Sequence, residues 1–239
     1  MNIDFSMPDI DLSNFDTSTT SNKKSDRIES KYIKPKSWKG FKERQIKYEN
    51  AAKLSKEIIV TKDERAFVII DGKFIFGDFI EVFITDRDLH IKELNISTLS
   101  FSQENIDSLE NLMYGGFVDK LNIIISDYFY SHERHSLIEY AYYKLDVDNR
   151  FQLSVARHHT KIACFETHCN KKFVLHGSAN LRSSDNIEQL VVEQSFNLYD
   201  FNKDWMDKIK EKYYTINQGI ELKPKSLRGK KSLECNTVK

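Results

Sequence analysis

Residues 158–188, HHTKIACFETHCNKKFVLHGSANLRSSDNIE, decide the fold of this 239-residue chain. Two runs in this stretch, residues 158–166 and 172–178, are rich in apolar side chains and are typical of strands that enter a core. The polar residues 167–171 between them are typical of a turn. The stretch therefore predicts two strands joined as a hairpin.

The two predicted strands carry polar side chains at a spacing that can form one site. Side chains two apart on a strand share a face, so His159 and Lys161 point the same way. Ser178 and Asn180 are also two apart, and Gly177 allows the backbone to approach closely at a crowded position. The hairpin can thus bring an imidazole, an ammonium, a hydroxyl and an amide to one place.

These groups are sufficient for chemistry at a phosphodiester without a metal or a cofactor. A neutral imidazole is a competent nucleophile near pH 7 when its other ring nitrogen donates to an acceptor, and we assign these roles to His159 and Glu188. Lys161, Ser178 and Asn180 would stabilise the charge on the phosphoryl oxygens. The leaving oxygen needs a proton from the opposite side of phosphorus, so a second copy of the set is required.

The same residues resemble a half-site of the phospholipase D superfamily, HxK…GSxN…RS…NxE. The matching segments are His159-Thr160-Lys161, Gly177-Ser178-Ala179-Asn180, Arg182-Ser183 and Asn186-Ile187-Glu188. In that superfamily two half-sites face each other, and one histidine attacks phosphorus while the other protonates the leaving group. Chains with one half-site form homodimers, and many small single-motif members are metal-independent nucleases. The resemblance implies that this chain is a homodimeric phosphodiesterase with nucleic acid as its expected substrate.

Several neighbouring residues have weaker assignments. Arg182 is a candidate for binding the substrate phosphate, with a structural ion pair as the alternative. His176 has the strand parity of the site serine and is a second substrate-binding candidate, with core packing as the alternative. His158 faces away from His159 on a strand. Glu166 stands where the superfamily has an aspartate, but its odd separation of seven residues from His159 predicts the opposite face and a structural role.

Three other interpretations stay open. The same chemistry could act on a phospholipid headgroup, although no amphipathic anchor is apparent in the sequence. The chain could also be a non-catalytic binding or assembly module, although such a module would more naturally have lost one of the polar residues. The third interpretation is a zinc-bound element, for which the spacing lacks a paired ligand clip; its candidate ligands are Cys164, His168, Cys169 and His176.

The rest of the chain alternates between strand and helix patterns. Residues 66–94 are dense in Val, Ile and Phe with Asp71-Gly72 and Gly77-Asp78 as turn signals, which predicts an antiparallel β-meander. Further along, we expect a strand near 94–102, helix 103–114 between Ser102 and Gly115-Gly116, strand 120–126, helix 131–145, strand 151–155 and helix 202–214. This order predicts an α/β fold, a three-layer αβα sandwich around a mixed β-sheet.

The ends of the chain differ in composition from its centre. We expect a disordered arm over 1–38, a helical lead-in over 39–61, one phospholipase D-like domain over 62–216 that begins with the meander (62–94), and a basic tail over 217–239. The formal net charge is zero, but residues 48–222 carry 20 basic and 28 acidic side chains. No apolar run approaches the roughly 18 residues of a membrane span. With three cysteines in no framework spacing, a cytoplasmic location is expected.

Overall fold

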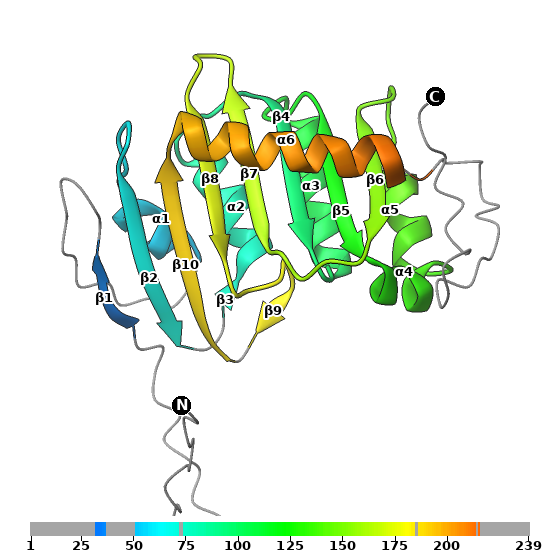
Figure 1. The fold of residues 1–239 in the computed structure, drawn as a ribbon, viewed down its shortest axis with the longest axis horizontal. Helices are drawn as coiled ribbons and strands as arrows, with labels where there is room; N and C mark the ends of the chain where they lie inside the picture. Colours follow the sequence, from blue (N-terminus) through cyan, green and yellow to red (C-terminus); the bar gives the residue numbers. More distant parts are fainter. Residues whose placement is uncertain (1–31, 37–50, 72–73, 185, 214, 216–239) are drawn as a thin grey trace, which may run out of the picture.

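The computed structural model describes residues 32–36, 51–71, 74–184, 186–213 and 215. Within these residues, eight strands form one mixed sheet in the order β1-β2-β10-β8-β7-β4-β5-β6 (Figure 1). The strands β4, β5 and β6 are parallel, and the other neighbours pair antiparallel. Their bounds are β1 Tyr32–Lys36, β2 Arg65–Asp71, β4 Ile91–Thr98, β5 Leu121–Ser126, β6 Phe151–Ala156, β7 Ile162–Thr167, β8 Lys172–Gly177 and β10 Ile187–Gln194. A separate two-stranded pair joins β3 (Phe74–Ile75) to β9 (Ser183–Ser184).

Helices cover both faces of the large sheet. Helix α6 (Phe196–Tyr213) crosses one face, and the remaining helices pack against the other face or its lower edge (Figure 1). Those helices are α1 Ala51–Glu57, α2 Phe76–Thr85, α3 Gln103–Tyr114, α4 Asp127–Glu133 and α5 Leu137–Leu145. The predicted three-layer αβα sandwich around a mixed sheet is confirmed.

The period-two alternation of the strands explains why two helical layers are needed. On β7, Ala163 and Phe165 pack in the large core with α1 to α5, whereas Cys164 packs in the smaller core beneath α6. On β8, Leu175 and Val174 divide between the two cores in the same way. Each central strand is therefore apolar on both faces, and each face must be covered by a helix.

The predicted β-meander over residues 66–94 is wrong in its centre, where the chain forms helix α2. The buried residues of this helix recur at the spacing of one helical face rather than in alternation: Phe76, Phe79, Ile80, Phe83 and Ile84. Strand β2 does not form a hairpin with β3, because β2 pairs with β1 and β10 while β3 pairs with β9. The dense aromatic content favoured a strand, but helical periodicity and core packing decide the structure.

Other predicted elements are confirmed with shifted ends. Helix α3 occupies the predicted 103–114, and the backbone N–H of Ser102 donates to Asn105 Oδ1 (2.9 Å) in a capping box. The predicted helix 131–145 is two helices, α4 and α5, and α6 begins at Phe196 rather than 202. Strand β7 begins at Ile162 rather than 158.

The flanking segments are described only in part. Residues 32–36 of the expected arm form β1, so this part is a strand rather than disordered. Of the lead-in expected over 39–61, α1 is the helical part that the structure describes. The rest of the arm, residues 39–50, and the tail from 216 onward lie outside the described residues.

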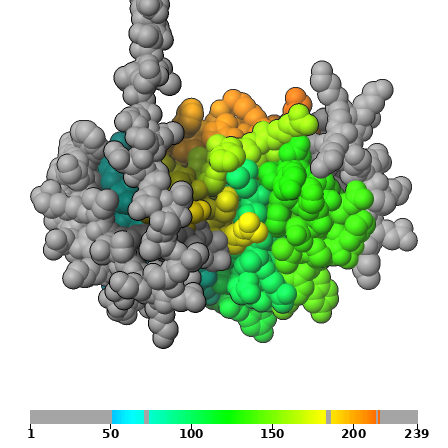
Figure 2. Space-filling view, turned by 90° about the horizontal axis from the view of Figure 1, so that it is seen from below, coloured from blue at the N-terminus to red at the C-terminus, as the bar shows by residue number. Residues whose placement is uncertain are grey.

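Strand direction gathers several chain segments at one edge of the sheet, the lower edge in Figure 1. Strands β4, β5, β6 and β8 end there, and β7 and β10 begin there. Figure 2 looks onto this edge, where the yellow residues near 180–188 lie beside the green residues of α3 to α5. The motif residues predicted from sequence all lie within a few residues of these strand ends.

Candidate active site

His159 and Lys161 meet at this edge, in the segment that leads from β6 into β7. The Lys161 ammonium lies 3.2 Å from His159 Nδ1 and 3.3 Å from the His159 carbonyl oxygen. His159 is exposed, whereas Lys161 retains only 8% of its accessible surface. The prediction that the two side chains share one side is confirmed, although both residues precede the strand.

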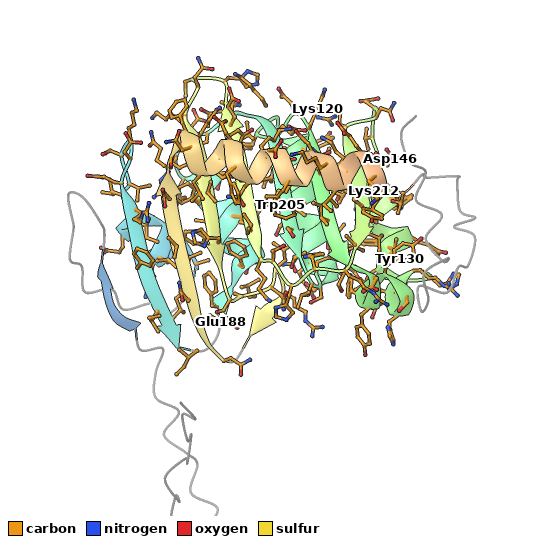
Figure 3. The ribbon with its side chains drawn as sticks, viewed as in Figure 1. Lys120, Tyr130, Asp146, Glu188, Trp205 and Lys212 are labelled. Atoms are coloured by element: carbon orange, nitrogen blue, oxygen red, sulfur yellow. The ribbon has the colours of Figure 1, made fainter. Side chains whose placement is uncertain are left out.

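The close approach of β8 and β10 places Ser178 against Glu188. The Ser178 hydroxyl donates to Glu188 Oε2 and accepts from the backbone N–H of Gln189 (2.9 Å). A Cβ on Gly177 would lie 2.9 Å from the carbonyl carbon of Gln189 and closer still to its oxygen. The prediction that Gly177 permits a close backbone approach is confirmed. In Figure 3, Glu188 lies at the lower edge of the sheet, far from Lys120 and Asp146 at the upper edge.

Lys161 and Glu188 are opposite charges that are both withdrawn from water. Glu188 is 7% exposed. Burial lowers the pKa of Lys161, and the negative charge of Glu188 acts in the opposite direction. Because removal of either charge would leave the other buried with less compensation, the two depend on each other for stability.

The segment after β8 is held against the end of β4. Asn180 Oδ1 accepts a hydrogen bond from the backbone N–H of Leu99 (3.2 Å), and the backbone N–H of Leu181 donates to Thr98 Oγ1 (3.3 Å). The backbone N–H of Gly77, in the first turn of α2, donates to the Leu181 carbonyl (2.9 Å). Asn180 is thus held at the same edge as Ser178, with its amide oxygen bonded to the backbone of the residue that follows β4.

A hydroxyl and imidazole cluster on the opposite side of the His159 segment was not predicted. Ser97 Oγ lies 2.5 Å from Thr160 Oγ1 and 3.2 Å from His158 Nδ1. Burial lowers the pKa of His158, against a hydrogen bond to the Ile125 carbonyl that raises it. The prediction that His158 faces away from His159 is confirmed by these contacts. The sequence signal was available, since Ser97 lies near the end of a predicted strand and Thr160 alternates with the site residues.

The structure separates His176 from the other candidates. Its neighbours across the sheet are Val191 and Ile162, on the face covered by α6, whereas Lys161 and Glu188 extend the opposite face. Burial lowers the pKa of His176, with a smaller effect from the charge of Arg65. This placement favours the packing alternative for His176, and its role in substrate binding stays a prediction.

Arg182 and Glu166 have different surroundings. Arg182 is exposed at the site edge, so the structure leaves its predicted contact with substrate phosphate untested. Glu166 lies near the other end of β7, where its carboxylate accepts from Lys92 Nζ at 2.7 Å. The structural role predicted for Glu166 is confirmed.

The zinc alternative is not supported by the placement of its cysteines. Cys164 is buried beside Met206 under α6, and burial raises the pKa of its thiol to about 12. Cys169 is exposed in the turn between β7 and β8. No group of three or more His, Cys, Asp or Glu side chains within the described residues is placed to hold a metal ion.

The helices of the described ranges give no candidate for a membrane span, because none of them combines the necessary length with sufficient apolar character. The cytoplasmic location expected from the sequence stays a prediction.

The arrangement offers a nucleophile next to a buried cation. A protonated lysine can only donate, so in the present arrangement His159 Nδ1 accepts from Lys161 and the ring proton lies on Nε2. An anionic phosphate would compete with Nδ1 for the Lys161 ammonium. Release of Nδ1 would let the ring proton move there and leave Nε2 as the unprotonated nitrogen.

Comparisons with known proteins give structural neighbours alone. No family model matches the chain, and no curated protein matches it. Among solved structures, the chain resembles Nuc from Salmonella typhimurium, described as a phospholipase D family member, with 16% identity over 61% of this chain and 93% of that chain and a TM-score of 0.42. NucT from Helicobacter pylori matches at 18% identity over 49% of this chain and 78% of that one, with a TM-score of 0.38. Phosphatidylserine synthase from Haemophilus influenzae matches at 11% identity over 64% of this chain and 41% of that one, with a TM-score of 0.42.

Proposed function

We propose that this chain is a metal-independent phosphodiesterase that hydrolyses phosphodiester bonds of nucleic acids through a phosphohistidine intermediate. The observation that carries the proposal is the exposed imidazole of His159 in contact with the buried ammonium of Lys161. Ser178 and Glu188 lie at the same edge of the sheet and are bonded to each other. Nucleophile, cation, hydroxyl and carboxylate are the groups that displacement at phosphorus requires.

In the first step, His159 Nε2 attacks phosphorus and the bond from phosphorus to the leaving oxygen breaks. The Lys161 ammonium moves from Nδ1 to a non-bridging oxygen, where it stabilises charge that develops in the transition state. The ring proton on Nδ1 then needs an acceptor. Glu188 is our candidate because it is a buried carboxylate at the same edge, bonded through one oxygen to Ser178.

The leaving oxygen takes its proton from a second imidazole on the far side of phosphorus, because one histidine cannot attack and protonate in line. This sequence contains one copy of the motif, so the second imidazole is His159 of a second copy of the chain. In the second step, that imidazole accepts a proton from water while the water oxygen attacks the phosphohistidine, and His159 of the first copy leaves. Atoms and charge then balance, and both imidazoles return to their starting state.

The proposal is tested with the full chain and a matched histidine control. Single- and double-stranded DNA, RNA, phospholipid vesicles and a generic phosphodiester are incubated with the protein in EDTA, beside His159→Asn and His168→Asn. His168 is an exposed histidine that contacts Asp119 (2.8 Å) away from the site edge, so its replacement leaves the chemistry intact. We expect nucleic-acid cleavage by the parent and by His168→Asn and none by His159→Asn.

Several results would overturn parts of the proposal. Cleavage that needs added metal, or that survives His159→Asn, would refute the phosphohistidine mechanism. If the protein hydrolyses vesicle lipid and leaves the nucleic acids intact, the substrate is a phospholipid and not a nucleic acid. The dimer is tested by sedimentation, and a monomer that retains full activity at all concentrations would contradict it.

A further inference from the structure

Helix α4 carries an exposed aromatic pair at the edge of the sheet where His159 lies. The helix starts directly after β5, and the Ser126 hydroxyl that caps it also donates to the Leu99 carbonyl (2.9 Å) at the exit of β4. Tyr128, on its first turn, is 67% exposed. The Tyr128 ring contacts the ring of His132, with centroids 4.1 Å apart and planes 37° apart.

The His132 ring is itself held in place, which fixes the tyrosine from one side. His132 Nδ1 lies 2.7 Å from the Tyr128 carbonyl oxygen, as expected for a hydrogen bond one helical turn along. Support by a second ring reduces the rotamers that Tyr128 can adopt and so lowers the entropy cost of stacking on it. One face of the Tyr128 ring is backed by His132, and the residue as a whole still presents most of its surface to solvent.

The carboxylate of Asp127 links Arg157 to this pair, because it accepts hydrogen bonds from both Arg157 and the backbone of Tyr128. Arg157 Nε donates to Asp127 Oδ2 (2.9 Å), while Asp127 Oδ1 accepts from the backbone N–H of Tyr128 (2.9 Å). The Arg157 side chain is nevertheless 78% exposed. A cation is therefore positioned beside the aromatic pair, two residues before His159 in the chain.

The aromatic pair and the His159 segment lie at the same edge of the sheet, two strand positions apart. Strands β5, β4 and β7 are neighbours in that order, with α4 leaving the end of β5 and the His159 segment entering β7 at the same edge. Two strand spacings amount to about 10 Å. This separation suits a phosphate at His159 and a base from a neighbouring nucleotide at Tyr128.

We propose that Tyr128, backed by His132 and flanked by Arg157, is a stacking platform for an unpaired base of a single-stranded nucleic acid whose scissile phosphate lies at His159. This inference rests on the proposed function and specifies its substrate as single-stranded. A base can lie flat on an aromatic ring only when it has left its own stack, which single strands allow at little cost. Arg157 would contact a backbone phosphate beside the stacked base.

Exposure alone does not distinguish Tyr128, since Tyr114 is 92% exposed. Tyr114 ends α3 at the opposite edge of the sheet, where Phe117 pairs with the start of β4 at Ile91. Tyr128 differs in having a ring partner, a neighbouring arginine and a place beside the site. Tyr114 is therefore the matched control.

Binding is measured in the full chain carrying His159→Asn, so that no strand is cut. Fluorescence anisotropy gives Kd for a labelled single-stranded oligonucleotide, the same length with abasic positions, and a duplex, at fixed salt. We expect Tyr128→Ala to weaken single-strand binding by roughly 5- to 150-fold, the range for loss of one stacked base. Tyr128→Phe should bind as the parent does, and Tyr114→Ala should have no effect. Arg157→Gln should weaken binding to the normal and abasic strands alike and reduce the salt dependence.

The outcomes separate this inference from the proposed function. If the His159→Asn parent binds the oligonucleotide but Tyr128→Ala behaves as Tyr114→Ala does, the platform is refuted while the nuclease proposal stands. An equal loss on normal and abasic strands would refute stacking. If the parent binds neither single strands nor duplex, the nucleic-acid substrate itself fails, and the platform falls with it. Circular dichroism melts of each variant verify that the fold is kept.

Discussion

Replacement of Gly177 by alanine is expected to disrupt the fold and the candidate site together. The added Cβ would lie 2.9 Å from the Gln189 carbonyl carbon and 3.2 Å from Leu190 Cα, and closer to the Gln189 oxygen. All three are backbone atoms of β10, so a side-chain rotation cannot relieve the clash. The end of β8 would have to move away from β10.

The cost follows from what that movement would break. Overpacking of a close contact costs about 1–3 kcal/mol. The same displacement strains the hydrogen bonds from the Gly177 N–H to the Lys161 carbonyl (3.2 Å) and from the Ser178 N–H to the Gln189 carbonyl (3.0 Å), each worth about 1 kcal/mol. We expect a loss of roughly 3–5 kcal/mol in the free energy of unfolding. Because Ser178 moves with β8, we also expect the hydrolysis rate to fall by about 100-fold.

Urea unfolding and the rate on a phosphodiester test both expectations. Gly116→Ala is the control, because Gly116 has a φ of +74° with nothing within 4 Å of its would-be Cβ. That variant should lose about 1–2 kcal/mol from backbone conformation alone, with its activity unchanged. If Gly177→Ala unfolds within about 0.5 kcal/mol of the parent, a value typical of neutral surface changes, the close approach of β8 and β10 is not a constraint and the reasoning fails.

Three further predictions concern ionisable groups. Glu93 is half-buried, and this partial burial raises its pKa. The hydrogen bond from Lys203 and the charge of Lys210 outweigh that effect and hold the pKa at about 2 against an ordinary 4.5. The lowered pKa stabilises the fold by about 3 kcal/mol above pH 4.5. Urea unfolding of Glu93→Gln beside the parent should therefore show a difference at pH 7 that shrinks by more than half at pH 3, and a constant difference would contradict the linkage. Burial lowers the pKa of Lys161, so the hydrolysis rate should begin to fall at an alkaline pH below the ordinary lysine pKa of 10.5. In a pH–rate profile, Lys161→Arg should move this alkaline decrease to higher pH. Burial lowers the pKa of His158 below 6.5, so the folded state disfavours the protonated imidazole and the free energy of unfolding should decrease as pH falls below 6.5. Thermal melts across pH 5 to 7 should show a smaller decrease for His158→Gln than for the parent.

The sequence predicted the site where its signal is local. His159 and Lys161 are two residues apart in an extended segment, so their contact depends on the chain between them and little else. The αβα sandwich followed from the alternating order of predicted strands and helices, which calls for a sheet with helices on its faces. Strand parity placed Glu166 on the other face of β7, where it bonds to Lys92.

Prediction failed where several local patterns fit one segment. The residues of α2 contain enough phenylalanine and isoleucine for a strand, and the helix wins because Phe79 and Phe83 pack one turn apart in the core. His176 has the strand parity of Ser178, yet the alternation of β8 ends with the strand at Gly177, and Ser178 bonds to Glu188. Periodicity does not reveal such a break, because it depends on how closely another strand approaches.

By itself, the sequence determined which groups are available to the candidate site and predicted which pairs of them share a side of the chain. Only the tertiary structure decided that Asn180 is bonded to the end of β4, that Glu188 and Lys161 are both buried, and that Arg157 pairs with Asp127. The physical reason is strand order. Contacts between segments far apart in the sequence depend on which strands become neighbours, and no local period in the sequence encodes that order.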